Sequence, residues 1–224
     1  PVVRVNTDPR DIVGEYRTAP EARGLNPSRT TVDLFGNVWT ANREEVDEIG
    51  EIPHGSAVKI GLLVGGTRVD AAGTPDPAGE YVAPPFGYNT CSDRNGDGFI
   101  QTSAGLDTVL DWPDVTDGLG GADGLVEDAL DECILIYQRR YDAEQERHVS
   151  VDADNNVWVV GYPLEQRMFY KLAGTDGAIL DSFDARGIGC GGYGGLVDGN
   201  GVLWSIGWGT GEGSLLRYDE SSGT

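Results

Sequence analysis

Three segments of the chain share one pattern of apolar and polar positions. In each, two runs of β-branched or aromatic residues flank a short turn rich in Gly or Asn, and the motif Val-Asp-x-x-x-x-(Val/Leu)-Trp crosses the turn. The three segments are residues 30–42 (TTVDLFGNVWTAN), 149–161 (VSVDADNNVWVVG) and 195–207 (GLVDGNGVLWSIG). Because Gly and Asn tolerate the positive φ angles of tight turns, each segment predicts an antiparallel β-hairpin.

The spacing of these hairpins predicts a repeat of four strands. Asp152 and Asp198 are 46 residues apart, which matches the roughly 40–50 residues of a four-stranded β-propeller blade. A basic residue follows each of the last two repeated Trp residues by thirteen positions, as Lys171 and Arg217. A second hairpin therefore follows the first in step, and the expected fold class is all-β, built from four-stranded antiparallel propeller blades.

The first hairpin is separated from the second by a longer stretch. Asp33 and Asp152 are 119 residues apart, 73 more than one repeat. The excess is either a whole lost blade or one insertion. An insertion is preferred, because residues 56–64 match a third strand, residues 133–140 match a fourth, and no Asp-to-Trp hairpin lies between them. The expected division is propeller blades in residues 1–64 and 132–224 and an inserted subdomain in residues 65–131.

Both ends of the chain match parts of a blade. Residues 2–16 (VVRVNTDPRDIVGEY) resemble a third strand, a turn and a fourth strand, and residues 215–224 (LLRYDESSGT) stop where a fourth strand should begin. The propeller is therefore expected to be incomplete. Either the chain is a fragment of a larger propeller, or its open edges pair with other copies or with a partner subunit.

One blade segment carries a family resemblance. Residues 27–43 read P-S-R-T-x-V-D-x-x-G-N-V-W-x-A-N-R, which resembles the blade motif of the extracellular, streptogramin-lyase-like and NHL-repeat-like β-propellers of bacteria. The resemblance covers the three hairpins and leaves out the insertion. It implies a propeller, but such blades serve lyases, lactonases, binding modules and adhesins alike, so it selects no activity.

The insertion contains a segment with the spacing of an EF-hand-type calcium loop. Residues 93–100 (DRNGDGFI) place oxygen-bearing side chains at loop positions 1, 3 and 5 and glycine at position 6, as in dockerin-like and other bacterial calcium loops. Position 12 holds Ala104 in place of the usual acid, so the last ligand must come from Asp107 or Asp111, or from Gln101 through water. The alternative is a polar turn rich in side-chain caps. The expected Ca²⁺ ligands are Asp93, Asn95, Asp97, the Phe99 carbonyl, Gln101 and Asp107.

Acidic residues and cysteines surround this loop. Residues 111–132 hold eight Asp and Glu side chains, which would repel one another without a cation, so the expected role of calcium is structural. Cys91 precedes the loop and Cys133 lies at the far edge of the insertion. A disulfide between them would close the base of the insertion, and the alternative is two buried thiols. Cys190 is left without a partner within the chain.

Charge and composition narrow the range of partners. The 224 residues include 37 Asp and Glu against 16 Lys and Arg, a formal net charge of −21. Such a surface repels the phosphate backbone of nucleic acid and anionic membranes. No apolar stretch approaches the length of a membrane span, and the chain does not open with a signal-type apolar segment. Together with the cysteine pair, these features favour a secreted, extracellular protein.

Candidate catalytic residues are sparse. His148 lies at the start of the first strand of a blade, where propeller side chains face the central channel. With Glu146 or Glu165 it could move a proton, as a streptogramin-lyase-like site requires. The alternative is a histidine bonded to a neighbour, without a catalytic role.

The function expected from these features is a calcium-stabilised extracellular binding, adhesion or structural-assembly module rather than an enzyme. Its ligand would be a glycan or a small molecule: Tyr162 and Tyr193 could form a sugar-binding groove, and Arg29 and Arg147 either hold a carboxylate or pair with neighbouring acids. The alternative function is a lyase or hydrolase, streptogramin-lyase-like or lactonase-like, acting on a small molecule in the propeller channel.

Overall fold

The computed structural model describes residues 1–8, 10–21, 23–45, 54–113, 126–140, 142–163, 167–207 and 215–223. Nearly all of the regular structure is β-strand, arranged in five antiparallel sheets of two to four strands, which confirms the all-β fold class. Within these ranges the helical structure is a single 3₁₀ turn, η1 (Val126–Asp128), and no helix is long and apolar enough to cross a membrane.

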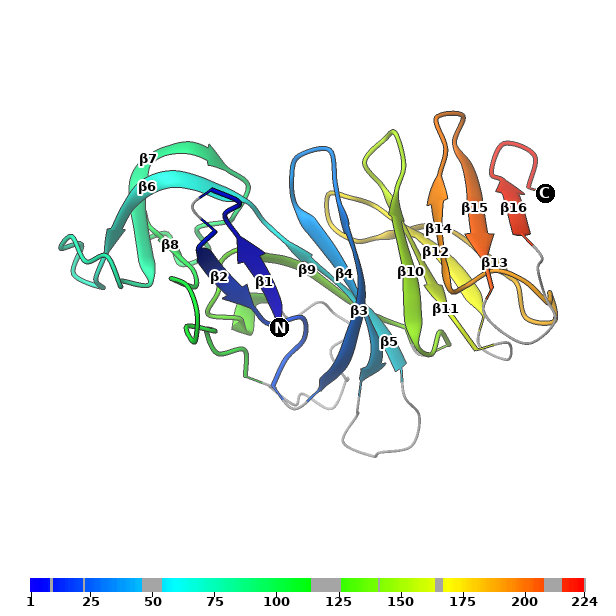
Figure 1. The fold of residues 1–224 in the computed structure, drawn as a ribbon, viewed down its shortest axis with the longest axis horizontal. Helices are drawn as coiled ribbons and strands as arrows, with labels where there is room; N and C mark the ends of the chain where they lie inside the picture. Colours follow the sequence, from blue (N-terminus) through cyan, green and yellow to red (C-terminus); the bar gives the residue numbers. More distant parts are fainter. Residues whose placement is uncertain are drawn as a thin grey trace.

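Three of the sheets are meanders in chain order that stand side by side along the long axis of the molecule (Figure 1). The first sheet has the order β3 (Gly24–Val32), β4 (Val38–Glu45), β5 (His54–Ile60) and β9 (Ile134–Arg140). The second sheet has the order β10 (Glu146–Val151), β11 (Val157–Gly161), β12 (Met168–Leu172) and β13 (Ile179–Asp184). The third sheet has the order β14 (Gly194–Val197), β15 (Val202–Ile206) and β16 (Leu215–Asp219).

This topology confirms the three predicted hairpins, which are β3–β4, β10–β11 and β14–β15. Strand β9 pairs antiparallel with β5, from Gly55 opposite Arg140 to Ile60 opposite Ile134, so residues 133–140 complete a sheet that the chain leaves and later rejoins. The expected third strand at residues 56–64 is shorter than predicted. Strand β5 ends at Ile60, because the chain turns away at Gly61, whose N–H donates to the carbonyl of Cys133 (2.7 Å).

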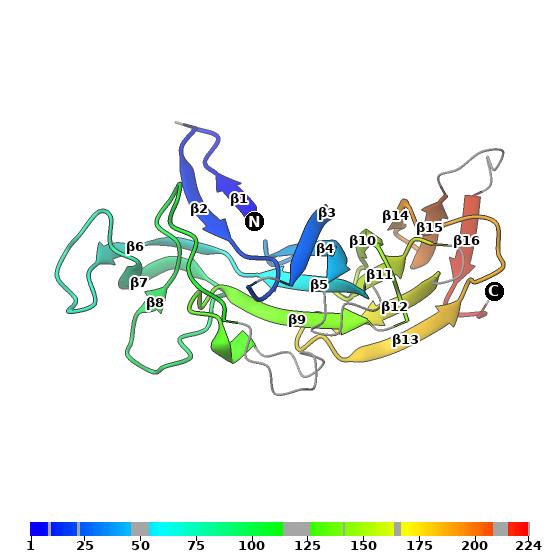
Figure 2. The same ribbon diagram turned by 90° about the horizontal axis from the view of Figure 1, so that it is seen from below.

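The two remaining sheets lie beside the first sheet (Figures 1 and 2). The N-terminal hairpin consists of β1 (Val2–Val5) and β2 (Ile12–Tyr16), as the sequence predicts for residues 2–16. The insertion sheet consists of β6 (Leu63–Val69), β7 (Tyr81–Asn89) and β8 (Ile100–Gln101). Tyr16 of the hairpin and Ile100 of the insertion are buried in one core with Val58 and Tyr137 of the first sheet, so all three units share apolar contacts.

The repeated aspartate holds the turn between the first two strands of each stacked sheet. One carboxylate oxygen of Asp33, Asp152 and Asp198 accepts hydrogen bonds from the backbone N–H groups two and four residues on, at 2.8–3.1 Å. The other oxygen of Asp33 lies 3.5 Å from Lys59 Nζ, and that of Asp152 lies 3.0 Å from Lys171 Nζ. The other oxygen of Asp198 instead accepts a hydrogen bond from Trp204 Nε1 on the second strand (2.8 Å). The repeated spacing therefore has a structural cause: each Asp holds its own turn, and Asp33 and Asp152 also tie that turn to the third strand.

The repeated tryptophan packs each sheet onto the next. Trp39 of the first sheet is fully buried in a cluster that includes Val149 of the second sheet. Trp158 of the second sheet is 1% exposed and packs in a cluster with Leu203 and Leu216 of the third sheet. The three sheets are therefore stacked by the same side chain at the same strand position.

The third sheet differs because its outer face is uncovered. Trp204 stands at the repeated position but is only half-buried. The cross-strand register puts Leu196, Ile206 and Leu215 on the same face, with 54%, 51% and 57% of their surface exposed. We call these four residues the open face. Within the described residues the row of sheets ends here and does not close on itself (Figure 1).

This difference in burial predicts unequal effects of two equivalent substitutions. Trp158→Ala removes a side chain packed between two sheets and should lower the free energy of unfolding by about 3–5 kcal/mol. Trp204→Ala removes a half-buried ring and should cost clearly less. Urea unfolding of the dilute proteins, followed by far-UV circular dichroism, measures both losses. Equal losses would contradict the stacking described here.

Candidate functional site

The segment predicted to bind calcium forms a compact turn between β7 and β8. The carboxylate of Asp93 accepts hydrogen bonds from the backbone N–H groups of Gly96 (2.7 Å) and Gly98 (2.9 Å). Asn95 and Asp97 each accept a bond from the N–H two residues on, at 2.8 Å. Both glycines have positive φ angles, 74° and 86°, which explains their place in the sequence. The three predicted side-chain ligands thus belong to one exposed turn.

The oxygens of this turn are hard donors of the type that Ca²⁺ takes. Asp93 and Asp97 supply carboxylates and Asn95 supplies an amide oxygen, each with lone pairs beyond those used by the backbone N–H groups. In the described part of the chain, no group of three or more His, Cys, Asp and Glu side chains gathers. A cation in this turn would therefore need the Asn95 amide oxygen and backbone carbonyl oxygens as ligands, in addition to the carboxylates of Asp93 and Asp97.

A glutamate that the sequence analysis did not single out holds the base of the turn. The carboxylate of Glu132 accepts hydrogen bonds from the N–H groups of Arg94 (2.8 Å), Asn95 (3.3 Å) and Gln101 (2.8 Å). Glu132 is 4% exposed. One buried side chain thus joins the start of the turn to the start of β8, and it fixes the backbone that positions Asp93 and Asp97.

Arg94, which lies inside the turn, also fixes the base of the turn, through hydrogen bonds to the segment before β9. The Arg94 guanidinium donates to the carbonyl oxygens of Ala129, Asp131 and Ile134. Burial lowers the pKa of Arg94, and the charge of Glu132 opposes this effect. Because these three carbonyls precede or begin β9, the turn is anchored to the chain segment that returns to the first sheet.

The predicted disulfide is present and closes the base of the insertion. Cys91 and Cys133 are bonded, with their Cα atoms 4.3 Å apart and 42 positions between them in sequence. A link of this span stabilises the folded state by about 4 kcal/mol in the chain-entropy estimate. Cys190 is a free, half-buried thiol. The disulfide also places Glu132 beside the turn, since Glu132 precedes Cys133 and Asp93 lies two residues after Cys91.

Two further predicted ligands have contacts away from the turn. The side-chain amide of Gln101 lies 3.5 Å from a carboxylate oxygen of Glu80, and the N–H of Asp107 donates to Glu15 on β2 (2.8 Å). Asp107 therefore lies against the N-terminal hairpin. The backbone N–H of Phe99 donates to Asp97 (2.8 Å). Residues 114–125, which hold three of the acids expected around the loop, lie outside the described residues.

His148 on β10 lies between the second and third sheets. Its Nδ1 is 3.1 Å from Ser205 Oγ and its Nε2 is 2.8 Å from Ser150 Oγ. A Cβ atom at position 195 would lie 2.5 Å from its Cε1, so Gly195 provides the space that the imidazole fills. The expected channel-facing position is therefore corrected: the side chain is 0% exposed, and both ring nitrogens are within hydrogen-bonding distance of serines.

The surroundings of this histidine keep it neutral. Burial, with a smaller contribution from the positive charge of Arg29, lowers the pKa of His148 to about 4. Of the two carboxylates considered as its partners, Glu146 is fully buried at the start of β10, and Glu165 lies outside the described residues. A neutral, fully buried imidazole packs two sheets together and is not accessible to a ligand from solution.

The arginines and tyrosines that the sequence analysis considered separately meet at one place. The Arg29 and Arg147 guanidinium carbons lie 5.1 Å and 4.3 Å from the centroid of the Tyr193 ring, and Arg147 Nη2 donates to the Tyr193 hydroxyl (3.3 Å). The Tyr162 ring contacts Tyr193 edge to face, with centroids 5.5 Å apart. Arg29 lies on β3, Arg147 on β10 and Tyr193 just before β14, so the first strands of the three stacked sheets converge here.

No protein-family model, curated protein or solved structure matches the chain.

The low pKa of His148 predicts a pH effect on stability. Its folded-state pKa of about 4 lies below the unfolded value of about 6.5, so the unfolded chain binds more protons between these values. The stability contributed by the neutral imidazole is complete above about pH 6.5 and declines as the pH falls toward about 4. The advantage of the wild type over His148→Gln should therefore shrink by about 3 kcal/mol between neutral pH and pH values near 4.

Urea unfolding of both proteins across this pH range measures the difference. Asp131, whose pKa burial raises to about 6, acts in the opposite direction. It is present in both proteins, so its contribution cancels. A pH-independent difference between wild type and His148→Gln would contradict a depressed histidine pKa.

Proposed function

We propose that the chain is a calcium-stabilised extracellular assembly module, built from propeller-type blades that associate with further sheets of the same kind. The observation that carries this proposal is the contrast between Trp39 and Trp158, which are buried under a following sheet, and Trp204, which is not. The meander order of the sheets supports propeller architecture, as does the contact of β10 with both β3 and β14.

A second copy of the chain is the partner that fits the open face. The residues of the open face occupy the same strand positions as the residues of the first and second sheets that pack against the following sheet. At the other end of the row, a groove of about 380 Å³ between β1 and the first sheet is lined by residues that include Val2, Val32 and Val38. In the second sheet, the equivalent positions Val151 and Val157 pack against the neighbouring first sheet. Each copy thus carries both halves of a head-to-tail contact, which builds a ring or a filament.

The oligomeric state of open-face variants tests this contact. Leu196→Asp places a carboxylate in the centre of the open face. The variant should therefore not associate, whereas the wild-type protein should. Leu180→Asp on β13 is the matched control, because Leu180 is equally exposed (53%) but lies outside the open face and should leave association unchanged. Sedimentation velocity over a range of protein concentrations, with native mass spectrometry, measures the assembly.

Two results would contradict head-to-tail assembly. One is a wild-type protein that stays monomeric at every concentration. The other is a Leu196→Asp variant that assembles as well as the wild type. Equal losses in both variants would point to charge repulsion rather than to the open face.

Calcium binding is the second part of the proposal. The turn of residues 93–98 offers three oxygen side chains at the spacing of a calcium loop, and Glu132 and the disulfide hold its base in place without using the ligand side chains. A bound Ca²⁺ would neutralise Asp93 and Asp97 in a chain of net charge −21. Its role is structural, since the turn links the insertion to the strand that rejoins the first sheet.

Thermal unfolding with calcium or with chelator tests this role. The wild type should gain about 3 kcal/mol of stability at a calcium concentration a hundredfold above the dissociation constant. The double variant Asp93→Asn/Asp97→Asn should lose this gain while keeping its fold. Asp76→Asn is the matched control, because Asp76 also accepts a backbone N–H in a turn of the insertion but lacks the calcium-loop spacing. A wild type that responds to calcium no more than the double variant would contradict the site.

An extracellular location agrees with the disulfide, since such bonds persist in oxidising compartments. The lyase or hydrolase alternative gains no support from its candidate catalytic residue, because His148 is fully buried and neutral. Assembly is therefore the function that we put forward for testing.

A further inference from the structure

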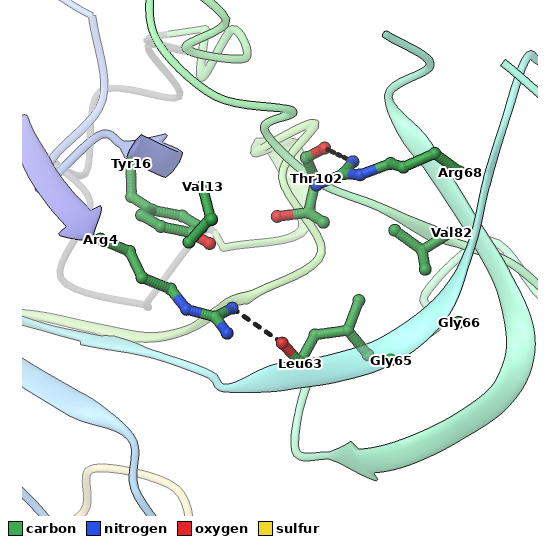
Figure 3. A pocket seen from close by; sticks show the side chains of 9 residues that line it. All are labelled: Arg4, Val13, Tyr16, Leu63, Gly65, Gly66, Arg68, Val82 and Thr102. Atoms are coloured by element: carbon green, nitrogen blue, oxygen red, sulfur yellow. Dashed lines mark hydrogen bonds between the residues drawn. The ribbon is translucent and has the colours of Figure 1, made fainter. Parts of the chain in front are cut away.

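A small cavity lies between the N-terminal hairpin and the insertion sheet. Its volume is about 140 Å³, enough for several water molecules or one small ligand. Nine residues from β1, β2, β6, β7 and the segment after β8 line it (Figure 3). The cavity is separate from the calcium turn, from the open face and from the Tyr193 cluster.

Two arginines point into this cavity from opposite sides (Figure 3). Arg4 of β1 donates from Nη1 to the carbonyl oxygen of Leu63 (2.7 Å) and also interacts with the Tyr16 hydroxyl. Arg68 of β6 is held more firmly, by the carbonyl oxygens of Gly79, Thr102 and Ser103. Burial lowers the pKa of Arg68, and the like charge of Arg4 adds to this effect. The two guanidinium groups are thus close enough to repel each other.

No acidic side chain balances these charges within the cavity wall. None of the nine lining residues is Asp or Glu. Two carboxylates outside the lining, those of Asp131 and Glu80, act electrostatically on Arg68. Asp131 is fully buried and accepts hydrogen bonds from the backbone N–H groups of Cys133 (2.9 Å) and Ser103 (3.2 Å). In a protein of net charge −21, two converging arginines without a lining carboxylate form a local site for an anion.

The rest of the wall restricts the kind of anion. Tyr16 and Thr102 bring hydroxyl-bearing side chains that are 4% and 2% exposed. Val13, Leu63 and Val82 supply apolar surface next to the guanidinium groups (Figure 3). A planar guanidinium fork matches the two oxygens of a carboxylate, and apolar walls suit a short hydrocarbon group.

We propose that this cavity binds the carboxylate of a small organic acid. Arg4 provides the principal contact, because fewer backbone carbonyls hold its guanidinium group than hold that of Arg68. Arg68 adds a second positive charge from the opposite wall. The apolar walls hold the short hydrocarbon part of the ligand. Binding joins the N-terminal hairpin to the insertion, since the two arginines belong to these two units.

Titration of the whole chain with sodium propionate tests the site. Isothermal calorimetry measures affinity, and NMR shifts of the backbone N–H groups of Gly65 and Gly66, which line the cavity, report location. We expect saturable binding to the wild type, and a dissociation constant about tenfold higher or more for Arg4→Gln, since a charge-assisted hydrogen bond is lost. Arg186→Gln is the matched control, because Arg186 is exposed and paired with Asp184 far along the chain; its affinity should match the wild type.

A second variant keeps the proposal testable if Arg4→Gln does not fold. Val13→Glu retains both arginines and places a carboxylate at the cavity wall, where it should occupy the site and abolish propionate binding. The same titration is repeated with sulfate, phosphate and chloride at matched ionic strength, to compare inorganic anions with propionate. The proposal is overturned if propionate does not saturate the wild type, if Gly65 and Gly66 do not shift, or if inorganic anions bind as tightly as propionate.

Discussion

The face-to-face packing of one sheet on the next is the constraint on which the rest of this structure depends. A single meander of short strands buries too little apolar surface to be stable alone. Trp39 and Trp158 supply that surface from the same strand position, and each is paired across the strands with a lysine, Lys59 or Lys171. The lysine in turn approaches the aspartate of the turn. One motif therefore stabilises a turn, a strand pair and a sheet interface together.

The insertion is tolerated because its two ends meet where the first sheet is already held together. The chain leaves at Gly61 and returns at Cys133, and a backbone hydrogen bond joins these two residues (2.7 Å). The disulfide to Cys91 and the carboxylate of Glu132 fasten the base of the insertion at the same place. A long excursion closed at its base adds little entropic cost to the pairing of β5 with β9. The sheet can therefore include a strand that comes more than seventy residues after its neighbour.

Much of this architecture could be predicted because it follows from local spacing. The Asp-to-Trp motif predicts the three hairpins, and the apolar run at residues 133–140 predicts β9. The disulfide is predicted from Cys91, just before the loop, and Cys133, at the far edge of the insertion. Burial was harder to predict. His148 occupies a strand position that the sequence assigns to an open channel, but Gly195 of the next sheet leaves space for its ring.

The contacts of Glu132 at the turn of residues 93–98 and the cavity lined by Arg4 and Arg68 could not be predicted from the sequence, for a related reason. Glu132 contacts Arg94 and Gln101, which lie 38 and 31 positions away. Arg4 and Leu63 are 59 positions apart. No periodicity links such pairs, since only the folded path of the chain brings them together. The disulfide was the one available signal, because a bond between Cys91 and Cys133 places Glu132 next to the turn.

The distribution of charge connects the two proposals on assembly and calcium. The basic residues are few, and several are used internally: Arg68, Arg94 and Arg167 each donate to three backbone carbonyls, and Lys59 and Lys171 are buried beside aspartates. Most acids in the described part of the chain are exposed or half-buried. With a net charge of −21, two copies repel each other at long range. Apolar contact through the open face must overcome this repulsion. Salt weakens this repulsion by screening the charges. A cation bound by the turn would reduce the repulsion by neutralising part of the negative charge. A calcium ion bound by the turn would therefore act on the proposed association through charge, even though the turn lies far from the open face along the row of sheets.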